Sequence, residues 1–356
     1  MSIARGTSSF LLSCLLAAAP LGAAPPAPPP STTEPPLIKP PKDEAPPGSF
    51  DLRPKFHIGQ DRRVRLSLDS SETKPDLTAE PDPKSNKQPS DETKTRQEFV
   101  LVFSPTKVNQ DGTTEVAIVF DQIKSHVEGS GVNESFDSQK PAPNPSPKPS
   151  TSKPAQSDPL NGLGKTPTLE ETLRPLVGEK LTAVFDRDGN VIDIRGGSKF
   201  VRALNPMAPE ELTQVGGDQE LRDLFKSIVS SPGKSFAKPG ESWSTDTSLD
   251  LFPIGGSRLH TDYRLTSAQG SKGKIAFQGK VAPSKDPSPG AAGLKLTRAD
   301  YSGTTDWDQE DGFARAMQSS QAIDAELKIG DQVITIKQTQ KMKLERLPDT
   351  RSPGKK

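Results

Sequence analysis

The sequence predicts a mainly β (α+β) fold of curved antiparallel sheets, with one short helical segment around residues 209–231. Three observations support this prediction: apolar and polar residues alternate in many short runs, turn sequences rich in Asp, Asn and Gly separate these runs, and a single segment has a helical period. With 37 prolines and only 31% hydrophobic residues, much of the chain is expected to lie outside any core.

The first predicted strands form a meander. Apolar residues alternate with polar ones over residues 63–68, and strand-like runs follow at residues 99–103 and 116–127. Between the last two runs, Asn109-Gln110-Asp111-Gly112 offers the left-handed backbone positions of a tight hairpin turn. Residues 181–194 predict a further hairpin of the same kind.

The strand pattern returns after residue 260. Alternation over residues 275–281 predicts one strand, residues 301–307 and 313–319 flank a turn, and an apolar run at residues 333–344 predicts the last strand. We therefore expect a second group of antiparallel strands in the C-terminal half.

A helix is predicted between the two groups of strands. Its apolar residues stand at i, i+3, i+4 and i+7, and they are Leu221, Leu224, Phe225 and Ile228. Asp218 can cap its start and Pro232-Gly233 ends it, while Pro209 begins a shorter turn before it. This segment is expected to cover one face of a sheet.

Low-complexity segments rich in Pro, Ser and Lys divide the chain. The predicted order is a signal peptide (1–24), a proline-rich disordered tether (25–52), an N-terminal β half (53–200) with disordered insertions at 70–95 and 137–168, a helical connector (201–235), a C-terminal β half (236–347) and a disordered tail (348–356). Composition leaves open whether the halves form one domain or two.

The turns at residues 185–191 and 307–313 share an aromatic residue followed by Asp and, later, Gly. A duplication would produce two related half-barrel-like halves, an architecture that can enclose an apolar ligand. The alternative is that any hairpin turn selects Asp and Gly.

The N-terminus has the layout of a secretory signal peptide: Arg5, an apolar run over residues 10–19, and small residues up to Ala24. Cys14 stands inside this segment, so lipoprotein anchoring through Cys14 is the alternative to cleavage near Ala24. Cleavage would leave no cysteine, which excludes disulfides and thiolate sites and favours a bacterial envelope. We expect an exported protein, periplasmic or extracellular, without a transmembrane helix in the mature chain.

Neither the charge nor the motifs of the sequence indicate nucleic-acid binding, cofactor binding or catalysis. Lys plus Arg and Asp plus Glu both number 46, so no net field favours nucleic acid. His57, His126 and His260 are isolated in the sequence, and the chain has no nucleophile elbow, phosphate loop or dinucleotide fingerprint. We therefore predict no catalytic, cofactor-binding or metal-binding residue and no cofactor.

Two acidic turns are the remaining candidates for cation binding. Residues 186–190 resemble the start of a calcium loop, but Gly197 stands where a bidentate glutamate is needed, which favours an ordinary turn. A denser cluster, Asp306, Asp308, Glu310 and Asp311, would bind cations only weakly, and solvated charges are the alternative.

Several short motifs resemble an uncharacterised domain-of-unknown-function family of exported bacterial β-rich proteins, over roughly residues 57 to 347. They are Gly59-Gln60, residues 109–112 with 116–120, Phe136-Asp137-Ser138, residues 178–189 and Gly240-Glu241-Ser242-Trp243. The resemblance implies a secreted β-rich fold and supplies no catalytic residue.

The sequence thus predicts a non-enzymatic envelope protein, a binding or carrier module for an apolar or protein ligand. The expected core or pocket-lining residues are Phe99, Leu101, Phe103, Phe120, Ile275 and Phe277. The alternatives are a structural or interaction scaffold without a cavity and, third, a hydrolase of an unrecognised class. An apolar pocket would favour the carrier, and a filled core the scaffold.

Overall fold

The computed structural model describes most of the predicted β regions. The described residues are 45–75, 90–129, 131–141, 168–197, 221–222, 224–226, 228–229, 233–251, 255–283, 294–329 and 332–348. The elements in chain order are β1 (Phe50–Asp51), β2 (Arg62–Pro75), β3 (Ser90–Val108), β4 (Thr114–Gly129), β5 (Val132–Asp137), α2 (Leu169–Leu173), the 3₁₀ helix η1 (Arg174–Leu176), β6 (Lys180–Phe185), β7 (Val191–Arg195), β8 (Phe236–Ala237), β9 (Ser242–Leu251), β10 (Gly255–Gln269), β11 (Lys272–Pro283), β12 (Leu294–Asp308), β13 (Phe313–Ile329) and β14 (Gln332–Arg346).

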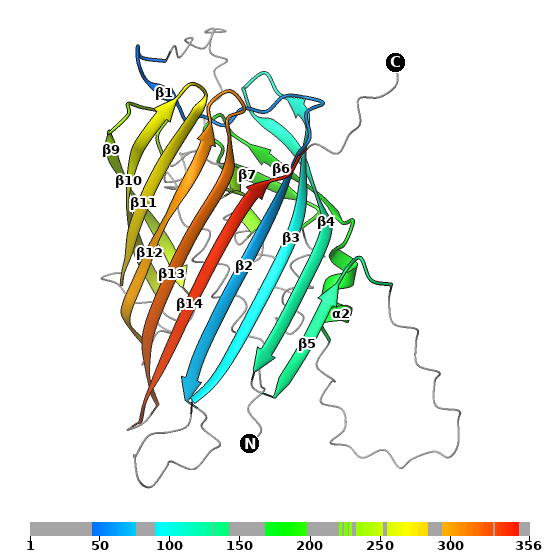
Figure 1. Ribbon diagram of the computed structural model, residues 1–356, viewed down its shortest axis with the longest axis vertical. Helices are drawn as coiled ribbons and strands as arrows, with labels where there is room; N and C mark the ends of the chain where they lie inside the picture. Colours follow the sequence, from blue (N-terminus) through cyan, green and yellow to red (C-terminus); the bar gives the residue numbers. More distant parts are fainter. Residues whose placement is uncertain are drawn as a thin grey trace, which may run out of the picture.

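One large antiparallel sheet of 12 strands dominates the fold (Figure 1). Its order is β7-β6-β4-β3-β2-β14-β13-β12-β11-β10-β9, with β5 beside β4. The meanders β2–β4 and β9–β14 meet where β2 pairs with β14. Within the described residues the sheet is open, because β7 and β9 stand at its two ends. The predicted mainly β, antiparallel, curved fold is confirmed.

The sheet has an inner face that is buried and an outer face that is charged. Directly opposite residues of an antiparallel pair point to the same face, so the register defines rows that cross the sheet. One such row joins Ile123, Phe99, Leu66, Leu344 and Met317, all of them buried. The alternation seen in the sequence thus separates the two faces.

Interruptions of the strand register accompany the curvature of the sheet. β10 and β11 shift between Leu265 and Ser267, and β12 and β13 shift between Asp306 and Trp307. A bulge adds a residue on one strand and increases the local bend and twist. These positions lie close to the end of the sheet that carries the β12–β13 turn.

An apolar core closes this end of the sheet, called the capped end below. The chain from Phe50 to Arg62 crosses it, and the Leu52 amide donates to the Ser235 carbonyl at 2.9 Å. Arg62 is buried and donates from Nη2 to the Asp311 carbonyl at 2.6 Å. The short sheet β1–β8 also forms here. The core at this end therefore joins the N-terminal segment to the C-terminal strands.

The predicted helix is present in its described part. Residues 221–222, 224–226 and 228–229 are helical, and Leu221, Phe225 and Ile228 are buried. The Phe225 ring packs edge-on against Phe103 at 6.2 Å between centroids, so the apolar stripe covers the inner face. Asp218 and Pro209 lie outside the described residues.

A second, unpredicted helix, α2, begins at a capping box. The Thr168 hydroxyl accepts a hydrogen bond from the Glu171 amide at 3.2 Å, and the Glu171 carboxylate accepts one from the Thr168 amide at 2.9 Å. Leu173 and Leu176 of α2 and η1 are buried in the core. Two turns of polar sequence are thereby tied to the sheet.

Three predicted disordered segments have different limits in the structure. Residues 50–52 were assigned to the tether, yet Phe50 and Leu52 are buried and β1 pairs with β8. The insertion predicted at 70–95 overlaps paired strands, because β2 extends to Pro75 and β3 begins at Ser90. The insertion predicted at 137–168 begins on the last residue of β5 and ends on the cap of α2. Backbone pairing extends strands through polar sequence that has no hydrophobic period. The signal peptide lies outside the described residues.

Candidate functional site

A band of buried, uncharged polar side chains crosses the inner face. It consists of Gln97, Ser125, Gln321 and Gln340, which are 4%, 4%, 7% and 3% exposed, and we call it the polar band. Gln97 of β3 lies opposite Ser125 of β4, and Gln321 of β13 lies opposite Gln340 of β14. Strands from both meanders therefore contribute to the band.

The polar band contains buried atoms with unused hydrogen-bonding capacity. Gln97 Nε2, Ser125 Oγ, both amide atoms of Gln321 and Gln340 Oε1 have no hydrogen-bond partner in the part of the chain that the structure describes. A buried donor or acceptor left unpaired costs about 1–3 kcal/mol. Such groups are usually paired in native proteins, so this unpaired set is a candidate contact surface for a ligand or ordered water.

An apolar row flanks the polar band on the side of the capped end, while apolar residues on the other side lie on β13. Toward the capped end lie Phe99, Leu344 and Met317, and beyond the band lie Ile323 and Ala325. The row of Ile323 continues through Gln338, Glu72 and Thr93, so the inner face is apolar toward the capped end and mixed beyond the band.

Four aromatic rings form a continuous row on the inner face of β9–β12, called the aromatic row below. The centroid distances are 5.7 Å from Trp243 to Tyr263, 6.1 Å from Tyr263 to Phe277 and 5.0 Å from Phe277 to Tyr301. A Cβ placed on Gly303 would lie 2.5 Å from Phe277 Cζ, so the ring lies across the backbone of the neighbouring strand. Glycine at this position lets the row lie flat against the sheet.

The two tyrosines of the aromatic row are neutral hydrogen-bonding groups. Burial raises the pKa of both Tyr263 and Tyr301 well above the ordinary value. A hydrogen bond with Ser319 lowers the pKa of Tyr301, but burial raises this pKa by more. Tyr301 stands directly opposite Gln321, so the aromatic row and the polar band meet there.

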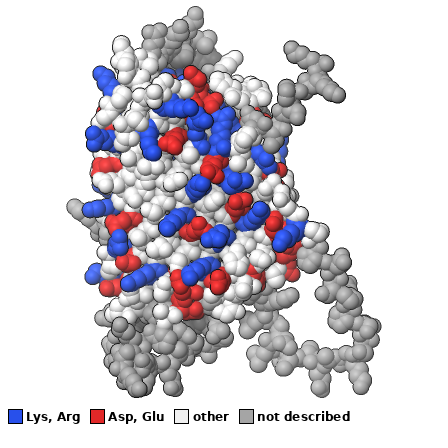
Figure 2. All heavy atoms as spheres, in the orientation of Figure 1, with Lys and Arg blue, Asp and Glu red and all other residues white. Residues whose placement is uncertain are grey.

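The outer face has a different character. Figure 2 shows lysine and arginine side chains intermixed with aspartate and glutamate over the strands. Cross-strand pairs include Arg65 with Glu98 at 3.6 Å and Arg96 with Asp69 at 2.7 Å. Exposed pairs of this kind contribute about 0–1 kcal/mol each and leave no single-sign field.

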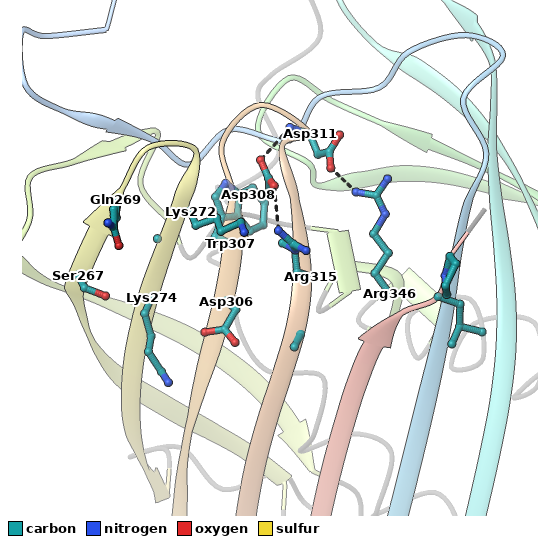
Figure 3. A pocket seen from close by; sticks show the side chains of 14 residues that line it. Ser267, Gln269, Lys272, Lys274, Asp306, Trp307, Asp308, Asp311, Arg315 and Arg346 are labelled. Atoms are coloured by element: carbon teal, nitrogen blue, oxygen red, sulfur yellow. Dashed lines mark hydrogen bonds and ion pairs between the residues drawn. The ribbon is translucent and has the colours of Figure 1, made fainter.

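A groove of about 900 Å³ lies near the capped end, beside the turn between β12 and β13. Figure 3 shows that charged side chains line it, with Asp308 facing Arg315 and Asp311 facing Arg346. Arg315 Nη1 lies 3.8 Å from Asp308 Oδ2, and Arg346 Nη1 donates a hydrogen bond to Asp311 Oδ2. Charged side chains and apolar groups such as Trp307 and Leu347 line the groove together, so it is not the purely apolar pocket expected of a carrier.

The predicted pocket-lining residues lie in the buried core. All six, Phe99, Leu101, Phe103, Phe120, Ile275 and Phe277, are at most 8% exposed, and none of them lines the charged groove. Phe277 belongs to the aromatic row, while Phe103 packs against the Phe225 and Phe313 rings. Among them, Phe277 is the residue closest to the role that the sequence predicted.

The acidic turns are held by hydrogen bonds within the protein. Asp186 Oδ1 accepts from the Asp188 and Asn190 amides at 2.9 and 2.7 Å, which is a turn arrangement. Asp308 Oδ1 accepts from the Glu310 amide at 3.1 Å. Within the described ranges, no group of three or more His, Cys, Asp or Glu side chains is arranged to hold a metal ion.

The three histidines lie apart. His260 Nδ1 is 3.0 Å from Asp246 Oδ1 on the outer face, and this hydrogen bond raises the His260 pKa above its ordinary value. His126 Nε2 lies 3.9 Å from Glu128 Oε2 on β4, and His57 lies in the segment before β2.

In the described part of the chain, no helix is long and apolar enough to cross a membrane.

Sequence reasoning missed the polar band. Its only signal is a polar residue where the strand period calls for an apolar one, as at Gln97 two positions before Phe99. Such a residue reads as the end of a strand when its cross-strand neighbours are unknown.

Comparison with solved structures finds distant likenesses. Lipovitellin, solved in a study of its lipid–protein interactions, matches 84% of this chain and 26% of its own at 10% identity, with a TM-score of 0.40. The chain thus spans about a quarter of that protein. DynF of Micromonospora chersina (9% identity, 85% and 88% covered, TM-score 0.18) and OpdQ of Pseudomonas aeruginosa (9%, 82% and 99%, TM-score 0.19) also match. TM-scores this low support no conclusion about function.

A family assignment is clearer. No curated protein matches the chain. A family model matches residues 111–314, from the turn before β4 to the first residues of β13, which is more than half of the chain. This agrees with the resemblance to an uncharacterised family noted in the sequence. The chain belongs to DUF6263, a family of unknown function.

Proposed function

We propose that the protein is a non-enzymatic binding or carrier module that holds an apolar ligand, or an apolar part of a partner, on the inner face of its sheet. The observation that carries this proposal is the polar band, five buried polar atoms without hydrogen-bond partners in the described residues. In a scaffold with a filled apolar core, these unpaired atoms would only destabilise the fold.

The energetic argument compares two uses of the same positions. In a plain core, each unpaired group costs about 1–3 kcal/mol, and an aliphatic side chain at Gln321 or Gln340 would remove that cost. In a binding face, a ligand group or water completes the hydrogen bonds. The presence of amides at paired positions on β13 and β14 supports the second use.

The dimensions of the face suit an elongated ligand. β3 has 19 residues and β13 has 17. At about 3.3 Å per residue, such strands extend roughly 55–60 Å. The aromatic row adds a flat apolar surface across four strands. A long acyl chain fits within these limits.

The proposed place of action is outside the cytoplasm, in the periplasm or extracellular space. The support is in the sequence: a signal-peptide layout at residues 1–24 and no cysteine after Cys14. Detection of the chain in a periplasmic fraction, starting near residue 25, tests this part independently of binding.

Native mass spectrometry of residues 25–356, purified under mild conditions and again after denaturing extraction, tests the binding role. We expect a mass excess that disappears on denaturation, with lipid recovered in the extract. The stripped protein should then bind the uncharged apolar fluorophore N-phenyl-1-naphthylamine. A bare mass together with no fluorophore binding contradicts the proposal.

A matched pair of variants locates the bound fluorophore. Gln321→Trp places a large ring on the inner face of β13 and should reduce fluorophore binding. Gln318→Trp places the same ring on the exposed outer face of the same strand and should not. Equal binding by both variants would place the fluorophore elsewhere.

The second candidate is an interaction scaffold without a cavity, and the charged groove is the observation that favours it. Its mixed charges suit a polar protein surface rather than an apolar ligand. If the protein carries no bound mass and does not bind the fluorophore, the scaffold is the favoured function.

A further inference from the structure

We infer that the ligand is a neutral amphipathic lipid, whose uncharged hydrogen-bonding group lies at the polar band and whose acyl chain lies along the apolar rows of the inner face. Monoacylglycerols, with ester and hydroxyl groups, are of this class. The inference rests on the proposed function and adds the chemical class of the ligand.

The chemistry of the polar band selects an uncharged group. Its unpaired atoms include donors, such as Gln97 Nε2 and Gln321 Nε2, and acceptors, Gln321 Oε1 and Gln340 Oε1. A group with both a carbonyl and a hydroxyl can satisfy both kinds. A carboxylate only accepts, so it would leave the two amide oxygens unpaired.

Within the described sheet, no positively charged residue stands on the rows of the polar band. Ser70, Thr95, Ser319 and Tyr301 on the same rows are neutral, and the charged residue at the β5 end of the Gln340 row, Glu134, is acidic. The lysines of β14 on either side of Gln340, Lys337 and Lys341, are exposed on the outer face. Burying an unpaired ionised carboxylate is strongly unfavourable.

Two further charged residues of the inner face, Arg62 and Glu72, do not attract an anion to the polar band. Arg62 stands at the capped end, where it donates to the Asp311 carbonyl. Glu72 lies one row beyond the polar band, opposite Gln338, and would repel a carboxylate or phosphate.

The aromatic row gives the acyl chain a surface next to the polar band. Tyr301 lies opposite Gln321, and Phe277 and Tyr263 extend the row away from it. An amphipathic molecule anchored at Gln321 would therefore lay its chain across β12, β11 and β10. Contact with flat rings buries acyl surface without requiring further polar groups.

Displacement of N-phenyl-1-naphthylamine from the stripped mature protein tests the inference, using 1-monolauroylglycerol and laurate, which share one acyl chain, at a pH where laurate is ionised. We expect the glycerol ester to displace the fluorophore at a concentration at least about tenfold lower than laurate. Laurate cannot donate a hydrogen bond to the amide oxygens of the polar band, and the loss of one such bond is worth about 1.4 kcal/mol or more.

The double variant Gln321→Leu, Gln340→Leu should abolish this preference, weakening the ester about tenfold while fluorophore binding persists. Gln318→Leu, on the outer face of β13, is the matched control and should keep the preference. Thermal unfolding followed by circular dichroism checks that each variant folds. Gln97→Met, at a separate position of the polar band, should also reduce the preference for the ester.

The two proposals fail in different ways. If the fluorophore binds but laurate displaces it as well as the ester does, the neutral-lipid inference is overturned and the binding role stands. If the wild-type protein binds neither the fluorophore nor the ester, the binding role itself is overturned, and this inference with it.

Discussion

Replacement of Leu52 tests whether the N-terminal segment belongs to the folded core. Leu52 is 0% exposed, and its amide donates to the Ser235 carbonyl. Leu52→Ala deletes three carbon groups, worth about 0.8 kcal/mol each, or about 2.4 kcal/mol of transfer free energy. The residual cavity adds to this, since buried Leu→Ala replacements cost about 2.7–5.0 kcal/mol. We expect a loss of about 3 kcal/mol in the free energy of unfolding.

The assay is urea denaturation of residues 25–356, followed by circular dichroism of the strands. Ile58→Ala is the matched control, because Ile58 lies in the same segment and is 64% exposed. Its effect should stay within about 0.5 kcal/mol. If Leu52→Ala is equally mild, the segment does not contribute to the core and the description of the capped end is wrong.

Three further predictions concern other parts of the sheet. Gly273→Ala places a Cβ 2.6 Å from Phe50 Cε1 and should cost about 1–3 kcal/mol in urea denaturation; the same cost in a Phe50→Ala background would contradict a clash with that ring. Thr168→Ala removes the capping box of α2 and should lower the local stability of that helix by about 0.5–2 kcal/mol, measured by hydrogen exchange of its amides; unchanged exchange would mean that the cap is not needed. The hydrogen bond with Asp246 raises the pKa of His260, so its stabilisation is fully present below the unfolded pKa of about 6.5 and is lost as pH rises through the higher folded value. The difference in stability between wild type and His260→Gln should therefore shrink on raising the pH from 6 toward 9, and a difference that grows would refute this.

Local pattern was enough to predict many of the strands and one helix. The alternation at Val64, Leu66 and Leu68 marked an inner face because a strand has a period of two, and all three side chains are buried. The stripe containing Leu221 and Phe225 marked a helix for the same kind of reason. Both rules act over a few residues, so a single sequence contains the necessary information.

Strand limits were less predictable where polar sequence continues a strand. β3 extends from Ser90 through Thr95, where no apolar residue marks the pattern, because its backbone pairs with β2. The helix α2 was missed because it is five residues long, too short to show a helical period. In both cases the partner, rather than the local sequence, stabilises the element.

By itself, the sequence determined the β class of this protein, most of its turns, the helix that covers the inner face and the absence of a net charge. Only the tertiary structure decided that β2 pairs with β14, which joins two meanders from opposite ends of the chain in one open sheet. It alone placed Gln97, Gln321 and Gln340 together on a buried face. A glutamine in a strand is ordinarily a surface residue, and whether it is buried depends on the register with distant strands, which no local pattern specifies.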